Sequence, residues 1–253
     1  MKYRLTNETI KVGEVILHRI ECVEAFSNVK TGDKGGWIEK ESNLSQTGNA
    51  WVRDNAKVYG DAQVYGNAQM YGNAEVYGNA EVYGNAQVYG NAEVCVNTKV
   101  YGNAWVYGNA QVCVNARVHG DAWVCGNAQV YGNAEVYDNA RVHGNAWVYG
   151  NAWVHGNAEV YGDAEVHGNA EVYGDAKISQ NSDYIVFKNS FSSGRYFTWT
   201  RSNNMWTVGC FCGTGEQLIE RARRDSEKKA RCYALYVKLV EDLLKVELSL
   251  SKE

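Results

Sequence analysis

Four histidines in the middle of the chain are the side chains best suited to proton transfer or metal binding. They are His119, His143, His155 and His167. A histidine can act as a general base near neutral pH, and converging histidines can bind zinc. All four, however, stand where a tyrosine stands in the surrounding six-residue repeat, VYGNAx. Replacement of one aromatic ring by another is the favoured interpretation, so we predict no catalytic residue, no metal site and no cofactor.

The six-residue repeat decides what these side chains can reach. Its aliphatic position begins at Val52 and recurs without insertion to Ile178, which makes 22 hexads. A strict period of six fits neither the 3.6-residue period of a helix nor a series of hairpins. It is typical of a β-helix, in which three hexads form one triangular coil. We therefore predict an all-β solenoid of about seven coils, with residues 18 apart stacked on each other.

Each residue type in the hexad suits a place in such a coil. Valine packs inside, glycine and asparagine accept the positive φ of a corner, and alanine fits beneath it. The second and sixth positions, which flank the valine, face outward. Because His143, His155 and His167 follow each other at intervals of two hexads, they lie on three different faces and cannot share one ion within a chain.

Departures from the repeat are the best candidates for function. Tryptophan occupies the outward sixth position at Trp51, Trp105, Trp123, Trp147 and Trp153. Trp105 and Trp123 are 18 apart, so we expect them to stack on one face. Large exposed aromatics are common at binding hot spots. The predicted binding residues are Trp105, Trp123, Tyr89, Tyr107, Arg117, Arg141, Trp147 and Trp153.

A second departure lies at one corner, where valine replaces glycine twice, one coil apart. We predict an interface there, formed by Cys95, Val96, Cys113 and Val114. Cys95 and Cys113 stack at a separation compatible with a disulfide. The seven cysteines show no secreted-scaffold spacing, so we expect thiols in a reducing compartment.

Composition divides the chain into three parts: an N-terminal β cap (1–50), the repeat (51–183) and a strand-plus-helix domain (184–253). The repeat has 6 basic and 14 acidic side chains, and the last part has 12 and 8. An acidic shaft repels phosphate backbones, which disfavours duplex nucleic acid. No apolar run is long enough for a membrane span, so we expect a cytoplasmic protein, in the host cytoplasm for a viral one.

Two stretches resemble known families. MKYRLT, FSNVKTGDKGGWIEKESNLSQTGNAWV and the repeat are similar to YdcK-like hexapeptide-repeat proteins, which are often labelled putative transferases. That resemblance implies a left-handed parallel β-helix and brings no assigned catalytic residue. Hexapeptide acyltransferases typically place a histidine near a loop that leaves the coil, and no loop leaves it between 52 and 178. RYFTWTR and MWTVGCFCGT, followed by helices, resemble a small domain of phage and prophage proteins.

These features lead to three functional hypotheses. The favoured one is a non-catalytic binding protein of phage type, which engages a host factor or sequesters a small anionic, nucleotide-like ligand to counter host defence. We expect a homo-oligomer, with a trimer favoured, and a ligand groove between subunits. The basic residues expected to bind an anionic ligand are Arg117, Arg141, Arg195, Arg201, Arg221, Arg223 and Arg224. An acyl- or nucleotidyl-sugar-type transferase and a structural spacer are the alternatives, so enzymatic activity stays open.

Overall fold

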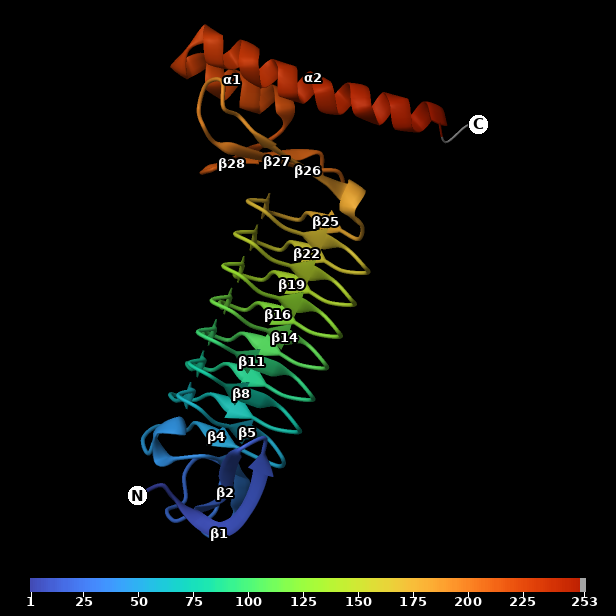
Figure 1. Cartoon of the computed structure of the whole chain (residues 1–253). Helices are drawn as coiled ribbons and strands as arrows, with labels where there is room; N and C mark the ends of the chain where they lie inside the picture. Colours follow the sequence, from blue (N-terminus) through green and yellow to red (C-terminus); the bar gives the residue numbers. More distant parts are fainter. Residues whose placement is uncertain (251–253) are drawn as a thin grey trace.

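The computed structural model, which describes residues 1–250, is a long shaft of stacked coils with a cap at each end (Figure 1). The N-terminal cap contains β1 (Tyr3–Val12), β2 (Val15–Cys22), β3 (Lys34–Ile38) and the 3-10 helix η1 (Glu41–Asn43). The C-terminal cap contains the 3-10 helix η2 (Asn181–Asp183), β26 (Tyr184–Lys188), β27 (Tyr196–Thr200), β28 (Met205–Val208), β29 (Phe211–Gly213), α1 (Gly215–Asp225) and α2 (Glu227–Leu250).

Three parallel sheets form the faces of the shaft. Face one contains β4 (Trp51–Val52), β7 (Gln69–Met70), β10 (Gln87–Val88), β13 (Trp105–Val106), β16 (Trp123–Val124), β19 (Arg141–Val142), β22 (Glu159–Val160) and β25 (Lys177–Ile178). Face two contains β5 (Lys57–Val58), β8 (Glu75–Tyr77), β11 (Glu93–Cys95), β14 (Gln111–Val112), β17 (Gln129–Val130), β20 (Trp147–Val148) and β23 (Glu165–Val166). Face three contains β6 (Gln63–Val64), β9 (Glu81–Val82), β12 (Lys99–Val100), β15 (Arg117–Val118), β18 (Glu135–Val136), β21 (Trp153–Val154) and β24 (Glu171–Val172).

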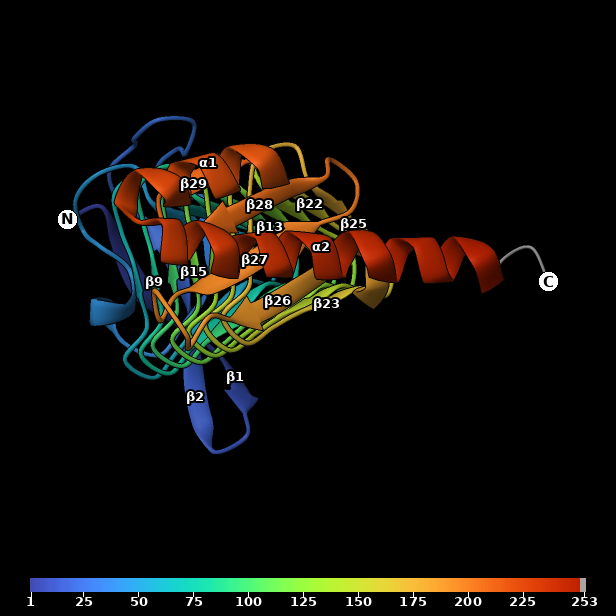
Figure 2. The ribbon, with the colours of Figure 1, turned by 90° about the horizontal axis from the view of Figure 1, so that it is seen from above.

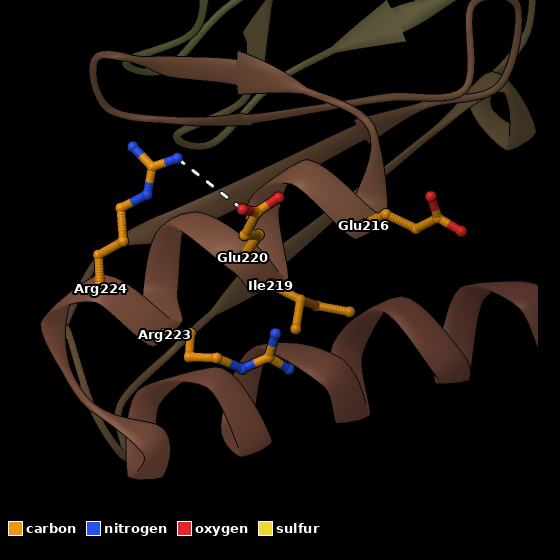
Figure 3. Close-up of a pocket in the computed structure, with 5 residues that line it drawn as sticks. All are labelled: Glu216, Ile219, Glu220, Arg223 and Arg224. Carbon is orange, nitrogen blue, oxygen red and sulfur yellow. Dashed lines mark ion pairs between the residues drawn. The ribbon is translucent and has the colours of Figure 1, made fainter.

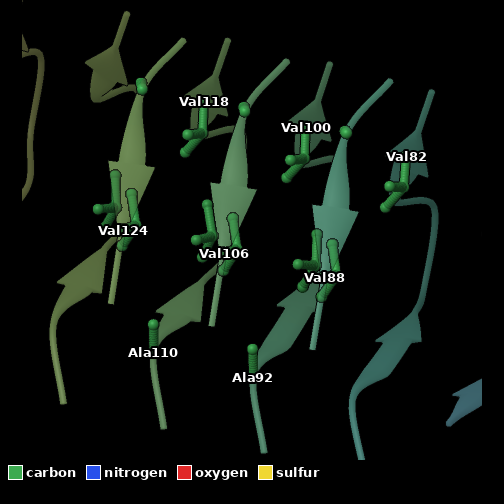
Figure 4. Packing of buried hydrophobic residues seen from close by; sticks show 14 of the residues in the cluster. Val82, Val88, Ala92, Val100, Val106, Ala110, Val118 and Val124 are labelled. Atoms are coloured by element: carbon green, nitrogen blue, oxygen red, sulfur yellow. The ribbon is translucent and has the colours of Figure 1, made fainter. Parts of the chain in front are cut away.

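The strand register confirms the predicted parallel solenoid. Neighbouring strands on a face pair residues at equivalent positions of successive coils, as Trp105 pairs with Trp123 and Val106 with Val124. The aliphatic residues and the alanines of the hexads point inward, and none of them is more than 1% exposed. Figure 4 shows these valines and alanines stacked from coil to coil. The interior is therefore a continuous apolar column, which supplies the main stabilising burial of the shaft.

One coil lies ahead of the first hexad. Ile38 pairs with Val58 and Leu44 with Val64, both in parallel, at a wider separation in sequence than the pairs of the later coils. This coil brings the solenoid to about eight turns. It also corrects the expectation for Trp51, which is not an outward tryptophan. Its side chain is only 1% exposed, because the rings of Tyr3 and Phe26 cover it at centroid distances of 6.2 and 5.4 Å.

The corners are held by glycine backbone and by ladders of asparagine side chains. Most corner asparagines donate from Nδ2 to Oδ1 of the residue one coil further on, as Asn109 does to Asn127 at 2.9 Å. The same ladder ends at Asp163, which accepts from Asn145 at 2.9 Å. A carboxylate accepts hydrogen bonds but cannot donate one, so aspartate suits the last rung.

The C-terminal cap closes the open end of the last coil. Backbone N–H groups there have no further coil to bond, and side chains of the cap accept from them instead. Glu165 N donates to Asn181 Oδ1 at 2.8 Å, and Glu171 N donates to Thr198 Oγ1 at 2.9 Å. The edge that would otherwise recruit another chain is thereby covered.

An antiparallel sheet in the order β26-β27-β28-β29 forms the base of this cap, and α1 and α2 pack on it. Thr214 caps α1 and forms the reciprocal capping box with Gln217. Seen from above, α2 crosses the end of the shaft and extends past it (Figure 2). No helix within residues 1–250 is long and apolar enough to cross a lipid bilayer.

A corner can need glycine for its positive φ or for the close approach of the next coil, and Gly108 and Gly168 distinguish these two reasons. Gly108 (φ +76°) and Gly168 (φ +69°) both adopt the left-handed conformation. A Cβ at Gly108 would lie 2.9 Å from the carbonyl oxygen of Gly126, whereas a Cβ at Gly168 would meet nothing within 4 Å.

We expect Gly168→Ala to lower the free energy of unfolding by about 1 kcal/mol and Gly108→Ala by at least twice that, because only Gly108→Ala adds a clash with the next coil. Denaturant unfolding of the two variants checks this, and equal losses would show that coil spacing absorbs the added methyl group.

Candidate binding face

Five of the predicted residues form one aromatic strip on face one. The indole rings of Trp105 and Trp123 stack with centroids 5.3 Å apart and planes 8° apart. The Arg141 guanidinium lies over the Trp123 ring at 4.7 Å, and the edge of Tyr89 meets Trp105 at 6.4 Å. Tyr107 stacks on Tyr89 at 4.8 Å. We call Tyr89, Trp105, Tyr107, Trp123 and Arg141 the aromatic strip.

The strip is pre-organised by the sheet beneath it. Because Trp105 and Trp123 are paired in register, their backbones fix the spacing of the rings before any ligand binds. Both indoles are half-buried and Arg141 is exposed. Within residues 1–250, no carboxylate lies within 4.0 Å of the Arg141 guanidinium, because Glu159, its in-register neighbour on the next coil, contacts His143 instead. A flat aromatic surface ending in a cation can stack on rings and bind an anion.

The other three predicted binding residues lie elsewhere. Arg117 and Trp153 are on face three, and Trp147 is on face two, where its ring meets the edge of Tyr131 at 6.4 Å. Trp147 is 39% exposed and Trp153 is 44% exposed. They are single surface tryptophans, and the structure does not bring them to the aromatic strip.

The predicted interface residues form a ridge at the corner between faces two and three. Val96 and Val114 are 43% and 44% exposed, and both have positive φ, +48° and +60°. That conformation is costly for a β-branched residue. Cys95 and Cys113 are joined by a disulfide, which corrects the expectation of two thiols. Direct stacking brings their Cα atoms to 4.7 Å, within the range that a disulfide spans.

The histidines belong to the outward aromatic ladders. His119 stacks between Tyr101 at 4.6 Å and Tyr137 at 5.1 Å. The phenol of Tyr137 has its pKa raised to about 12, first by burial and then by nearby carboxylates such as Glu171. The phenol of Tyr137 therefore stays uncharged at neutral pH, and stacking on the rings of His119 and His155 holds it in the ladder.

Each of three histidines also contacts a glutamate of the next coil. The Nε2–Oε1 distances are 2.9 Å for His119–Glu135, 2.9 Å for His143–Glu159 and 3.2 Å for His155–Glu171. The His143 contact holds the pKa of Glu159 below its usual range. These pairs were not predicted from the sequence, although an acid at the sixth hexad position of the next coil is a signal for them. Tyrosines make the same contact, as Tyr65 does with Glu81 at 2.9 Å, so the geometry is a property of the repeat.

The arginines of the C-terminal cap are divided between ion pairs and an open cavity. Arg201 binds Glu247, and Arg223 lies 3.6 Å from Glu227. Figure 3 shows the ion pair of Arg224 with Glu220, at 3.9 Å. Arg195 and Arg221 line a cavity of about 450 Å³ beside β29. Within residues 1–250 there is no group of three His, Cys, Asp or Glu side chains arranged to hold a metal ion.

The disulfide gives a direct chemical prediction. The chain has seven cysteines, and five of them are free: Cys22, Cys125, Cys210, Cys212 and Cys232. Protein denatured without reductant should therefore release five thiol equivalents in a thiol assay, and reduced protein should release seven. The Cys95→Ser variant should release six with or without reductant. Seven equivalents from unreduced wild-type protein would contradict the disulfide.

Two comparisons with known proteins agree with this architecture. A family model described as the YdcK β-solenoid repeat matches residues 128–144, 135–150 and 140–156. A protein of Escherichia coli strain K12, named "Uncharacterized acetyltransferase YdcK", is 36% identical over 61 residues, which cover 21% of this chain and 19% of that protein. The match thus spans about a fifth of the length of this relative. The chain is a β-solenoid repeat protein that is similar, over part of its length, to YdcK.

Proposed function

We propose that this chain is a non-catalytic binding protein, in which a rigid shaft presents the aromatic strip to another molecule. The observation that carries the proposal is the regularity of the coil around the strip. From Val52 to Ile178 every corner is a short turn, and no segment leaves the shaft to build a cavity over face one. A flat, prestacked surface is suited to docking against a second surface.

The partner that fits this surface best is a protein. Trp105 and Trp123 offer rigid apolar area, and Arg141 supplies a charge that can bind a carboxylate at the margin. In the phage-type setting that the C-terminal resemblance implies, the partner would be a host factor. Self-association of shafts along their faces, as a trimer, would put several strips side by side and form the groove for a nucleotide-like anion.

One observation favours transferase activity as a second candidate. The three histidine–glutamate pairs resemble an oriented general base, and the relative in Escherichia coli carries the name of an acetyltransferase. Against this, each pair lies on an open face and repeats the tyrosine–glutamate contact of neighbouring coils.

The binding proposal is tested by removing the strip without disturbing the coil. Glutamine already occupies the sixth hexad position at Gln87 and Gln111, so Trp105→Gln/Trp123→Gln should fold like wild type. Native mass spectrometry of protein purified from its own host should show a partner, an oligomer or a retained nucleotide for wild type and lose it in this double variant. The matched control, Trp147→Gln/Trp153→Gln, removes two exposed tryptophans from the other faces and should retain it. A wild-type monomer without partner or ligand would contradict the binding proposal and favour the alternative that the shaft is a structural spacer.

The transferase candidate is tested on the same preparations. Incubation with acetyl-CoA and a panel of amines and sugars should release no CoA above the background rate. His119→Tyr and His155→Tyr restore the repeat residue and keep the ladder while removing the imidazole. CoA release by wild type that either substitution abolishes would establish catalysis and overturn the non-catalytic proposal.

A further inference from the structure

Helix α2 carries a second apolar stripe beside the one that packs in the C-terminal cap. The packed stripe includes Tyr233, Val237 and Val240, which belong to the core of the cap. The second stripe alternates intervals of four and three residues, which is the heptad spacing of a coiled-coil seam. We call it the α2 seam, and its residues are Cys232, Tyr236, Leu239, Leu243, Val246 and Leu250.

Most of the α2 seam is uncovered within residues 1–250. Its first two residues, Cys232 and Tyr236, also pack against the core of the cap. Leu239 is 45% exposed, and the exposed fraction rises along the helix to 64% at Leu250. The C-terminal part of α2 extends past the end of the shaft, away from the other described elements (Figures 1 and 2). Because soluble monomers rarely expose long continuous apolar rows, the seam indicates an interface.

A hollow lies at the opposite end of the seam from Leu250. It has a volume of about 430 Å³ and is lined by Glu227, Lys228, Arg231, Cys232 and Leu235. In an antiparallel pair of α2 helices that layers Leu239 on the partner's Leu243, each step forward along one helix is a step back along the other. The partner's Leu250 then lies opposite Cys232. The hollow is therefore at the place where the end of a second α2 would dock.

The charges of α2 also favour an antiparallel second copy. Residues 227–238 carry four basic and one acidic side chain, whereas residues 239–250 carry one basic and three acidic side chains. The last turn of a helix carries partial negative charge, and the last turn of α2 has no basic residue of its own. Antiparallel pairing brings Lys228 and Arg231 of one copy to that end of the other. Parallel pairing would instead place like charges side by side.

We propose that α2 forms a homodimer in which the seams of two copies pair in antiparallel orientation. Leu239 packs on the partner's Leu243, and the partner's Leu250 enters the hollow beside Cys232. The basic first half of each helix lies along the acidic second half of the other. This dimer does not depend on what the aromatic strip binds, and it differs from a trimer of shafts because the faces of the shaft take no part in it.

Light scattering during size-exclusion chromatography tests the dimer on the full chain. Wild-type protein at about 100 μM should have about twice the 28.2 kDa mass of one chain. Leu243→Gln puts an amide in the middle of the seam and should weaken the dimer at least about tenfold, because each dimer contains the change twice. The matched control Leu248→Gln changes an exposed leucine of the same helix outside the seam and should dimerise like wild type.

A cross-link tests the orientation of the two helices. Cys232 is a free thiol. Under mild oxidation with diamide, Leu250→Cys should give a covalent dimer through Cys232 of the partner subunit, and Leu250→Cys/Cys232→Ser should not. A parallel dimer would instead join Cys232 to Cys232 of the partner subunit in the wild-type protein.

The aromatic strip serves as an independent control. Trp105→Gln/Trp123→Gln should leave the α2 dimer intact, so failure of this dimer and failure of the strip to bind a partner are distinguishable. The dimer proposal is overturned if wild-type protein at about 100 μM has the mass of a monomer or a trimer. It is also overturned if Leu243→Gln and Leu248→Gln dimerise equally well, or if wild-type protein is cross-linked through Cys232 alone.

Discussion

The direction of the backbone hydrogen bonds is the constraint on which the rest of this structure depends. In every coil the N–H groups donate to carbonyls of the following coil, as Trp153 N donates to Ala170 O at 2.9 Å. The bonds between coils therefore point toward the C-terminal end, except at Val96, whose N–H donates back to Tyr77 O at 3.3 Å. This direction leaves a row of carbonyls at one end of the shaft and a row of N–H groups at the other. The asparagine ladders have the same direction, and the ladder through Asn145 ends at an aspartate, Asp163.

The N-terminal cap supplies hydrogen-bond donors and the C-terminal cap supplies acceptors, because the first coil exposes carbonyl groups and the last coil exposes N–H groups. At the start of the shaft, Lys2 Nζ donates to Ala50 O at 2.9 Å and Asn43 Nδ2 donates to Ala62 O at 2.9 Å. Burial lowers the pKa of Lys2 to about 8, a cost that this bond and the ring of Phe26 offset. At the far end the cap supplies acceptors such as Thr198. Neither cap could close the other end.

The hexad period was sufficient to predict the coil, the three faces and the stacking of Trp105 on Trp123, because the fold repeats without insertion. Where the period changes, prediction failed. The first coil was missed because Ile38 and Leu44 are further from their partners in sequence than the hexad period allows. The burial of Trp51 depends on rings from β1 and a distant loop. The cavity lined by Arg195 and Arg221 depends on how two helices pack on a sheet, which no local pattern in the sequence records.

Because three hexads form one coil, the number of hexads sets the length of the shaft and also the rotational orientation of the C-terminal cap about the shaft axis. Insertion of a whole coil would move the C-terminal cap about 4.8 Å further along the shaft axis. The rotational orientation of the cap about that axis, relative to the aromatic strip, would stay the same. Insertion of a single hexad would turn the cap by a third of a revolution, and Asn181 and Thr198 would meet the wrong edges of the last coil. Such a chain can change its reach only in whole coils if its two ends are to keep the same orientation.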